Sequence, residues 1–289
     1  MIELNSLLTT KRKFEKAKLI KVFSFIAALL VLFSFMAIFL FIIIKGLPKL
    51  SLNFIFGKNT ARIPTISAPI FNTLTIIFFT LLIAVPIGVF TAITLTEYLK
   101  RGNKFVEIVK IATETLSGIP SIIYALFGMV FFVKFLGWGY SLKAGICTLS
   151  IMILPTIIRS TEDSIKSVPD ILREASYGLG AGKLRTVSKV IIPAASKGIL
   201  ASVILSIGRI VGESAAVLFT AGSSLNAGPN FLNSQGATLA VSMYLLIERG
   251  GTIEYAYTAA LVLLFCVVII NIFSTYIGKR FGEKYDQNI

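Results

Sequence analysis

Two pairs of charged residues lie inside long apolar segments, where an unpaired charge costs about 2.5–3.5 kcal/mol on insertion scales. Arg159 and Glu162 are three residues apart, and Arg209 and Glu213 are four apart, so each pair would share one face of a helix. A guanidinium offers a planar donor fork that matches the oxygens of phosphate-like anions. We therefore expect both arginines to contact an oxyanion in transit, with the glutamates partly neutralising them so that binding stays weak enough for release. The alternative is two salt bridges that hold helices in register.

The sequence gives little support for catalysis, metal binding or nucleotide binding by this chain. The chain contains no His, and its acidic residues are scattered, so neither a nucleophile–base pair nor a metal cluster is expected. Cys147 and Cys266 lie in apolar segments and are expected to be small core residues. The Gly178–Leu184 stretch resembles a phosphate-binding loop but has Tyr177 where the first Gly is needed and Leu184 where Ser or Thr is needed. The chain therefore predicts no nucleotide, cofactor or metal site of its own.

A polar, basic stretch, Ser167–Pro193, separates two apolar segments. Ser167 is expected to cap a helix whose first turn contains Pro169, and glycines 178, 180 and 182 permit a sharp reversal. A second short amphipathic run is expected to end at Pro193. The stretch predicts a helix–turn–helix on a membrane face, small enough to be gripped by another protein.

Composition predicts an all-α integral membrane protein. Of 289 residues, 55% are hydrophobic and only 15% charged, whereas soluble domains carry roughly 25% charged residues. Runs long enough to cross a bilayer, about 20 residues each, predict six transmembrane helices at Val22–Ile44, Phe71–Leu95, Ser117–Leu136, Lys143–Ser167, Ala194–Ala221 and Tyr257–Ile277. The first is expected to be an uncleaved span, because it is too long for a signal-peptide core. The net charge of +14 suits anionic membrane lipid and argues against nucleic acid as a partner.

Three segments are expected to depart from simple spans. Phe105–Leu116 is amphipathic and is expected near the interface. Gly118 and Pro120 either start the third span or interrupt it, and an interruption would place a helix N-terminus where it could assist an anion. Ala237–Ile247 is too short to cross, so it is expected to be interfacial or re-entrant.

The distribution of Lys and Arg predicts the orientation. Twenty of these residues fall on the side that holds both termini and the central stretch, and seven fall on the other. Positive charge marks the cytoplasmic side. We expect a cytoplasmic segment at 1–21, the first span at 22–44, a periplasmic loop at 45–68, a transmembrane domain at 69–278 and a cytoplasmic tail at 279–289.

The central stretch resembles the "EAA" loop of ABC importer permeases. The resemblance rests on spacing: Glu174-Ala175-Ser176, then Gly180, then Val190 to Pro193. Ser176 in place of Ala and Ile192 in place of Leu are mild departures. It implies the type I importer fold, with this loop as a coupling helix docked on a separate ATPase, and so a non-catalytic subunit in a bacterial cytoplasmic (inner) membrane.

The chain is similar, in particular, to the phosphate branch of that family. The string from Gly118 to Gly128, the Gly212–Ala221 run and the Arg159, Glu162 and Arg209 positions carry this resemblance, which covers Pro69 to Gly278. It favours one of the branch's two homologous membrane subunits over the other. It implies inorganic phosphate as substrate, and as partners a homologous permease, two ATPase copies that use ATP and magnesium, and an extracytoplasmic phosphate-binding protein.

Several alternatives stay open at this point. The chain could serve another oxyanion or be the second membrane subunit of the same machine. A membrane-embedded enzyme lacks its catalytic constellation, and a passive anion channel would leave the central loop without a purpose. The outer loops Lys45–Ser67 and Gly222–Gly236 either dock a binding protein or are merely solvated.

Overall fold

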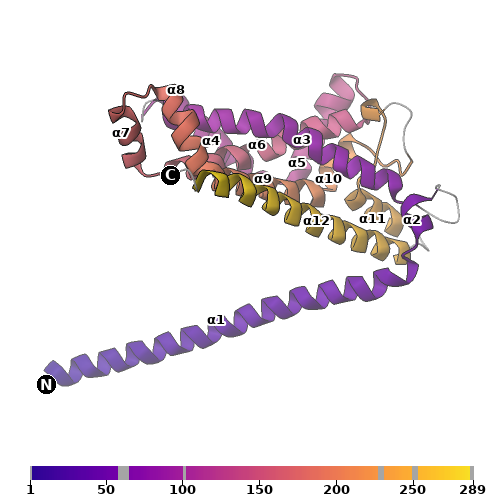
Figure 1. Ribbon diagram of the computed structural model, residues 1–289. Coiled ribbons are helices and arrows are strands. Elements are labelled where there is room, and N and C mark those ends of the chain that lie inside the picture. The colour runs from indigo at the N-terminus through magenta and orange to yellow at the C-terminus, as the bar shows by residue number, and fades with distance from the viewer. Residues whose placement is uncertain (1, 58–64, 100–101, 227–230, 249–252, 287–289) are drawn as a thin grey trace.

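The computed structural model describes residues 2–57, 65–99, 102–226, 231–248 and 253–286, with side chains described from residue 20 to residue 276. The described chain is helical, without strands, which confirms the expected all-α class (Figure 1). Its α-helices are α1 (Ile2–Gly46), α2 (Leu52–Phe56), α3 (Ser67–Ile93), α4 (Lys104–Ser117), α5 (Ser121–Gly128), α6 (Leu142–Lys166), α7 (Asp170–Gly178), α8 (Lys183–Thr186), α9 (Ile192–Gly212), α10 (Ala215–Thr220), α11 (Leu239–Glu248) and α12 (Ile253–Asp286).

Five continuous helical stretches among the described residues are long and apolar enough to cross a membrane. They are Ile20–Lys49, Ser67–Tyr98, Leu142–Lys166, Lys183–Gly212 and Ile253–Tyr276. A sixth crossing is possible through the pair α4 and α5, which bend by 101° at the break containing Gly118 and Pro120. Of the six predicted spans, the first, second, fourth and sixth are confirmed as helices, and the third starts at Ser121, directly after Pro120.

Helix α6 forms the centre of the bundle. It packs against α3, α9, α4, α5 and α10. Of the residues in its most apolar stretch, 67% are buried, a larger share than in any other long helix described. Small residues permit this packing, because Gly88 of α3 lies directly against Ile157 and Gly198 of α9 against Ser164. The bundle is therefore assembled around the helix that contains Arg159 and Glu162.

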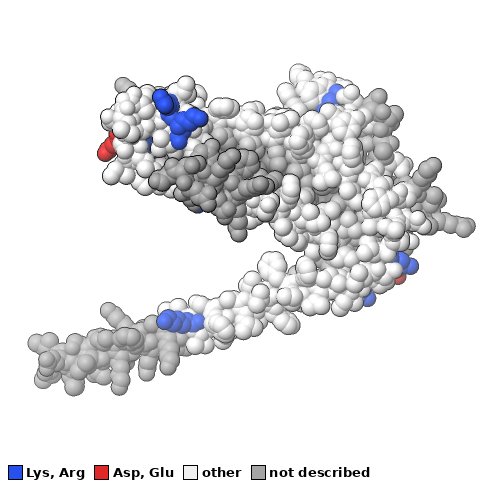
Figure 2. Space-filling model, viewed as in Figure 1, with Lys and Arg blue, Asp and Glu red and all other residues white. Residues whose placement is uncertain are grey.

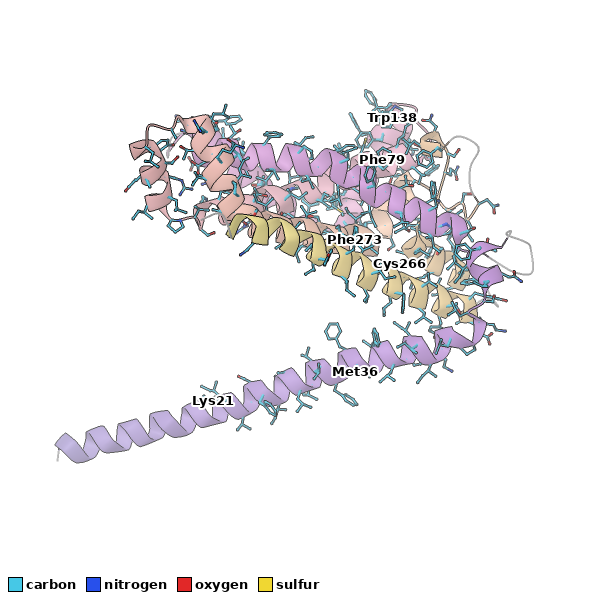
Figure 3. The ribbon with its side chains drawn as sticks, viewed as in Figure 1. Lys21, Met36, Phe79, Trp138, Cys266 and Phe273 are labelled. Carbon is cyan, nitrogen blue, oxygen red and sulfur yellow. The ribbon has the colours of Figure 1, made fainter. Side chains whose placement is uncertain are left out.

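Both chain ends point to the same end of the molecule as α7 and α8, whereas α2 and α11 lie at the opposite end (Figure 1). Helix α1 touches the bundle near Gly46, whose carbonyl accepts a 2.9 Å hydrogen bond from Thr258, and then diverges from it. The side chains of Lys21 and Met36 stand clear of the bundle on this helix (Figure 3). The apolar span of α1 is thus left for lipid or another subunit to cover.

Two helix boundaries differ from the prediction at the fifth span. A helix over Ala194–Ala221 was expected, but α9 ends at Gly212 and α10 restarts at Ala215. At its other end, Pro193 does not stop the preceding run, because it occupies the first turn of α9 directly after a π-helical stretch, Val187–Ile191. Proline is tolerated in a first turn, where its missing N–H is not needed.

The start of the central loop also differs from the prediction. Ser167 does not cap the next helix: it ends α6, and its hydroxyl donates to the Ser164 carbonyl. Helix α7 begins at Asp170 with Pro169 just before it.

The end of the bundle that holds α2 and α11 is well packed. Within the loop expected at 45–68, Phe54 of α2 is fully buried and stacks on Tyr255 with ring centroids 5.2 Å apart. Helix α11 is short, as expected, and packs on α12 and α3. The Thr73 hydroxyl accepts from the Leu239 N–H at 2.9 Å, which anchors the start of α11 to α3. Residues 58–64 and 227–230, in the two loops expected to lie outside the membrane, are not among the described residues.

Candidate functional site

Arg209 lies in the last turn of α9, directly before the break in the fifth span. Its guanidinium donates a 3.3 Å hydrogen bond to the hydroxyl of Thr156 on α6. The side chain is half-buried, and among the described residues no carboxylate lies within ion-pair distance of it. The site therefore holds a partly desolvated cation whose hydrogen-bond partner, Thr156, is neutral.

Glu213 does not pair with Arg209, contrary to the prediction. Because α9 ends at Gly212, Glu213 turns away from the helical face of Arg209, and its carboxylate accepts a 3.1 Å hydrogen bond from the Ala216 N–H. It thereby satisfies a free donor at the start of α10. Glu213 is thus a helix cap at the break rather than a counter-ion.

Arg159 and Glu162 do not pair with each other either. Arg159 lies 3.4 Å from Glu114, and Glu162 contacts Lys110 at 3.4 Å and also Lys166. Helix α4 packs on α6 and brings Glu114 and Lys110 into reach, and Lys166 lies one turn along α6 from Glu162. Glu162 is buried within this cluster, whereas more than half of the Arg159 side chain is exposed. The cluster consequently fixes α4 to α6 and leaves Arg159 accessible.

The two interrupted helices pack against each other. Helices α5 and α10 are in contact, and both contact α6. Tyr124 bridges the bend between α4 and α5, because its hydroxyl donates a 2.8 Å hydrogen bond to the Leu116 carbonyl on the other side of the bend. The Tyr124 side chain is buried. Broken helices at membrane depth are tolerated where they are buried in protein or line a cavity. Sequence reasoning missed Thr156, an ordinary residue type inside an apolar run. It included Tyr124 in the Gly118–Gly128 string but did not predict its bond across the bend.

The central loop folds as the two short helices that were expected. Helix α7 is followed by a turn in which Gly180 has φ of +81°, a conformation that favours glycine, and then by α8. Glu174 and Ala175 are exposed, as are Ile171, Leu179 and Leu184. Ser176 is buried instead, and its hydroxyl lies 2.8 Å from that of Thr186, which joins α7 to α8. Ser176, which stands where Ala is usual, therefore stabilises the packing of α7 on α8 through its hydroxyl, while Glu174 and Ala175 face outward.

Charge is concentrated at the two ends of the molecule. In Figure 2 the blue and red side chains lie over the α7–α8 end and near the opposite end, with a broad uncharged band between them. Cys266, labelled on α12 in Figure 3, and Cys147 of α6 are free thiols. Both are half-buried and pack against the edge of an apolar cluster, so they are less buried than the predicted core residues. Side chains of the basic residues 11–18 and 279–284 lie outside the described part of the chain.

Comparison with known proteins identifies the family that this chain resembles. The family described as "Binding-protein-dependent transport system inner membrane component" matches residues 84–283. The chain is 35% identical over 280 residues to the probable ABC transporter permease protein YqgI of Bacillus subtilis, covering 91% of this chain and 93% of that protein. It is 33% identical over 269 residues to the phosphate transport system permease protein PstA of Pasteurella multocida, covering 90% and 93%. With PstA of Mycobacterium leprae the identity is 36% over 66% of this chain and 63% of that protein.

Solved structures share the fold. A bacterial alginate ABC transporter gives a TM-score of 0.66 over 89% of this chain and 94% of that chain, at 16% identity. The MetNI methionine ABC transporter in an inward-facing conformation gives 0.56 over 73% and 93%, at 23% identity. These similarities confirm the architecture expected for a type I importer permease.

Proposed function

The chain belongs to the family of binding-protein-dependent transport system inner membrane components, and on that premise we propose that it is the PstA-type subunit of an ATP-driven inorganic phosphate importer. ABC importer permeases of this family are multi-span proteins of the bacterial inner membrane. Phosphate as substrate is suggested by relatives named PstA that align over nine-tenths of the chain or two-thirds of it.

The observation that carries the substrate proposal is Arg209. Its guanidinium is half-buried, contacts a neutral hydroxyl, and adjoins the break between α9 and α10. A cation left without a carboxylate partner in a partly desolvated setting attracts an oxyanion more strongly than a paired one would. A single fork on the path also binds weakly enough to let the anion leave. Arg159, exposed beside Glu114, is proposed as a second contact nearer the α7–α8 end.

The coupling proposal rests on the exposed face of α7. Glu174 and Ala175, together with the turn at Gly180, form a handle at the end of the molecule where both termini lie. We propose that this end is cytoplasmic and that an ATPase dimer of the PstB type holds the handle. A homologous PstC-type permease would complete the pore, and an extracytoplasmic PstS-type phosphate-binding protein would deliver the substrate. ATP and magnesium would be used by the ATPase alone.

The test is uptake of labelled inorganic phosphate by proteoliposomes that contain this chain with those three partners. We expect uptake that requires ATP inside the vesicle and is not reduced by excess sulfate. Arg209→Lys keeps the charge but removes the fork, so we expect it to lower uptake about tenfold, as for loss of a charge-assisted hydrogen bond. Uptake inhibited equally by sulfate would favour a permease for oxyanions in general, and undiminished uptake by Arg209→Lys would reject the proposed role of the fork.

A further inference from the structure

Arg173 is the residue of the central loop that is most tightly held by the rest of the chain. Its Nε and Nη2 donate to the Glu97 carboxylate at 3.2 and 2.8 Å. Nη1 donates to the Val168 carbonyl at 2.8 Å and to Asp170 at 3.0 Å, and Nη2 also donates to the Ile165 carbonyl at 3.0 Å. One guanidinium thus makes five hydrogen bonds to four residues.

These contacts join three separate elements. Ile165 lies in the last turn of α6, where helix carbonyls have no partner within the helix. Glu97 lies in a π-helical turn, Thr94–Tyr98, that ends the α3 span. Arg173 lies in α7 and so binds this helix to the ends of both α6 and α3. Changes of helix type of this kind often occur at functional sites.

The pair is shielded from water, unlike the rest of the handle. The Arg173 and Glu97 side chains are 16% and 7% exposed, whereas the neighbouring Ile171 is 70% exposed. Burial by itself lowers the pKa of Arg173, but the hydrogen bonds and charges of Glu97 and Asp170 together outweigh it and leave that pKa above its ordinary value. The guanidinium therefore stays charged. Separating the pair would leave the Glu97 carboxylate without its counter-ion in a poorly solvated place, which is strongly unfavourable.

Other polar contacts of the loop do not provide an equivalent connection. The bond between Ser176 and Thr186 joins α7 only to α8. Lys183 lies over the Tyr98 ring at 5.2 Å, but Tyr98 is exposed, and cation–π contacts at exposed sites are weak. Leu172 of α7 also packs against an apolar cluster that contains Ile93 of α3. Within the described residues the Glu97–Arg173 pair is therefore the charged connection between α7 and the end of the α3 span, and it adds direction to this apolar contact.

We propose that Glu97 and Arg173 are the positioning residues through which a displacement of α7 is passed to α3, so that breaking the pair uncouples ATP hydrolysis from transport. This inference rests on the proposed function, in which an ATPase moves α7. Because the outward face of α7 takes no part in the pair, the ATPase would still bind and hydrolyse ATP when the pair is lost. A displacement of α7 would then produce a smaller displacement of α3.

The test compares Glu97→Gln with Glu107→Gln in the reconstituted four-component complex, measuring labelled phosphate taken up and ATP hydrolysed in the same vesicles. Glu107 is an exposed carboxylate on α4 without an ion pair among the described residues, so it controls for the loss of one charge. We expect Glu97→Gln to lower the phosphate-to-ATP ratio about tenfold, within the range typical of coupling between sites. We expect Glu107→Gln to leave the ratio unchanged.

A parallel loss of uptake and hydrolysis, with an unchanged ratio, would assign the pair a merely structural role and overturn the inference, as would a ratio equal to that of the wild type. If Glu97→Gln does not assemble, Glu97→Asp keeps the charge while shortening the side chain. It should give an intermediate ratio, and a wild-type ratio would again overturn the inference. Absence of ATP-driven phosphate uptake by the wild-type complex would instead refute the proposed function.

Discussion

The contact between the two interrupted helices can be tested by adding one methyl group at Gly128 of α5. A Cβ built there would lie 2.2 Å from the Thr148 Oγ1, 2.7 Å from the Thr148 Cγ2 and 2.8 Å from the Thr220 Cγ2. Since carbon atoms pack at about 3.5–4.0 Å, the methyl group would be about 1 Å too close to α6 and α10 at once. Thr148 cannot easily turn aside, because it is β-branched and its hydroxyl donates to the Ala144 carbonyl at 2.8 Å.

Overpacking of this kind costs about 1–3 kcal/mol, so Gly128→Ala should lower the free energy of unfolding by that amount. Gly208→Ala on α9 is the matched control, because a Cβ there meets nothing within 4 Å and alanine should gain about 0.5–1 kcal/mol in helix propensity. Reversible unfolding in mixed micelles measures both. Adding Thr148→Ala to Gly128→Ala should recover part of the loss, since it removes both nearest atoms and the two sites are coupled. Equal stability of Gly128→Ala and Gly208→Ala would refute the packing argument.

Two further predictions concern single side chains. Phe54→Ala removes a fully buried ring that stacks on Tyr255, so it should lower the free energy of unfolding by about 3–5 kcal/mol in the same assay. Phe56→Ala on the same short helix, where the ring is 75% exposed, should not lower it by this amount. Equal effects of the two substitutions would contradict the assigned burial. Thr156→Val removes the acceptor of the Arg209 hydrogen bond and should raise the KM for phosphate about fivefold, for a bond worth about 1 kcal/mol. Thr156→Ser retains the hydroxyl and should leave the KM unchanged. An unchanged KM in the valine variant would show that Thr156 does not position Arg209.

The spans and the central loop could be predicted because their signals are local. Long apolar runs locate α3, α6 and α12, and glycine at position 180 marks a turn that requires positive φ. The break after Gly212 was missed because the apolar run continues on both sides of it, and because Glu213, which caps α10, also suits an ion pair with Arg209. Local propensity cannot distinguish these two roles.

The partners of Arg159 and Glu162 were missed for a different reason. Spacing along one helix suggests a pair at three residues, but α4 supplies Glu114 and Lys110 as partners, and Lys166 of α6 lies closer to Glu162 than Lys110 does. Glu97 and Arg173 are 76 residues apart in the chain, so their pairing depends on how α3 and α7 meet. Tertiary contacts of this kind have no signal in a single sequence.

The central claim is that α7 is a handle on the cytoplasmic side of the membrane. Leu179, which follows α7 and is 90% exposed, can be replaced by cysteine in a chain whose Cys147 and Cys266 have been changed to alanine. A membrane-impermeant maleimide should leave this cysteine unlabelled in intact cells and label it fully after permeabilisation. Labelling of Leu179→Cys in intact cells would place the handle outside, beyond the reach of any cytoplasmic ATPase, and would contradict the account.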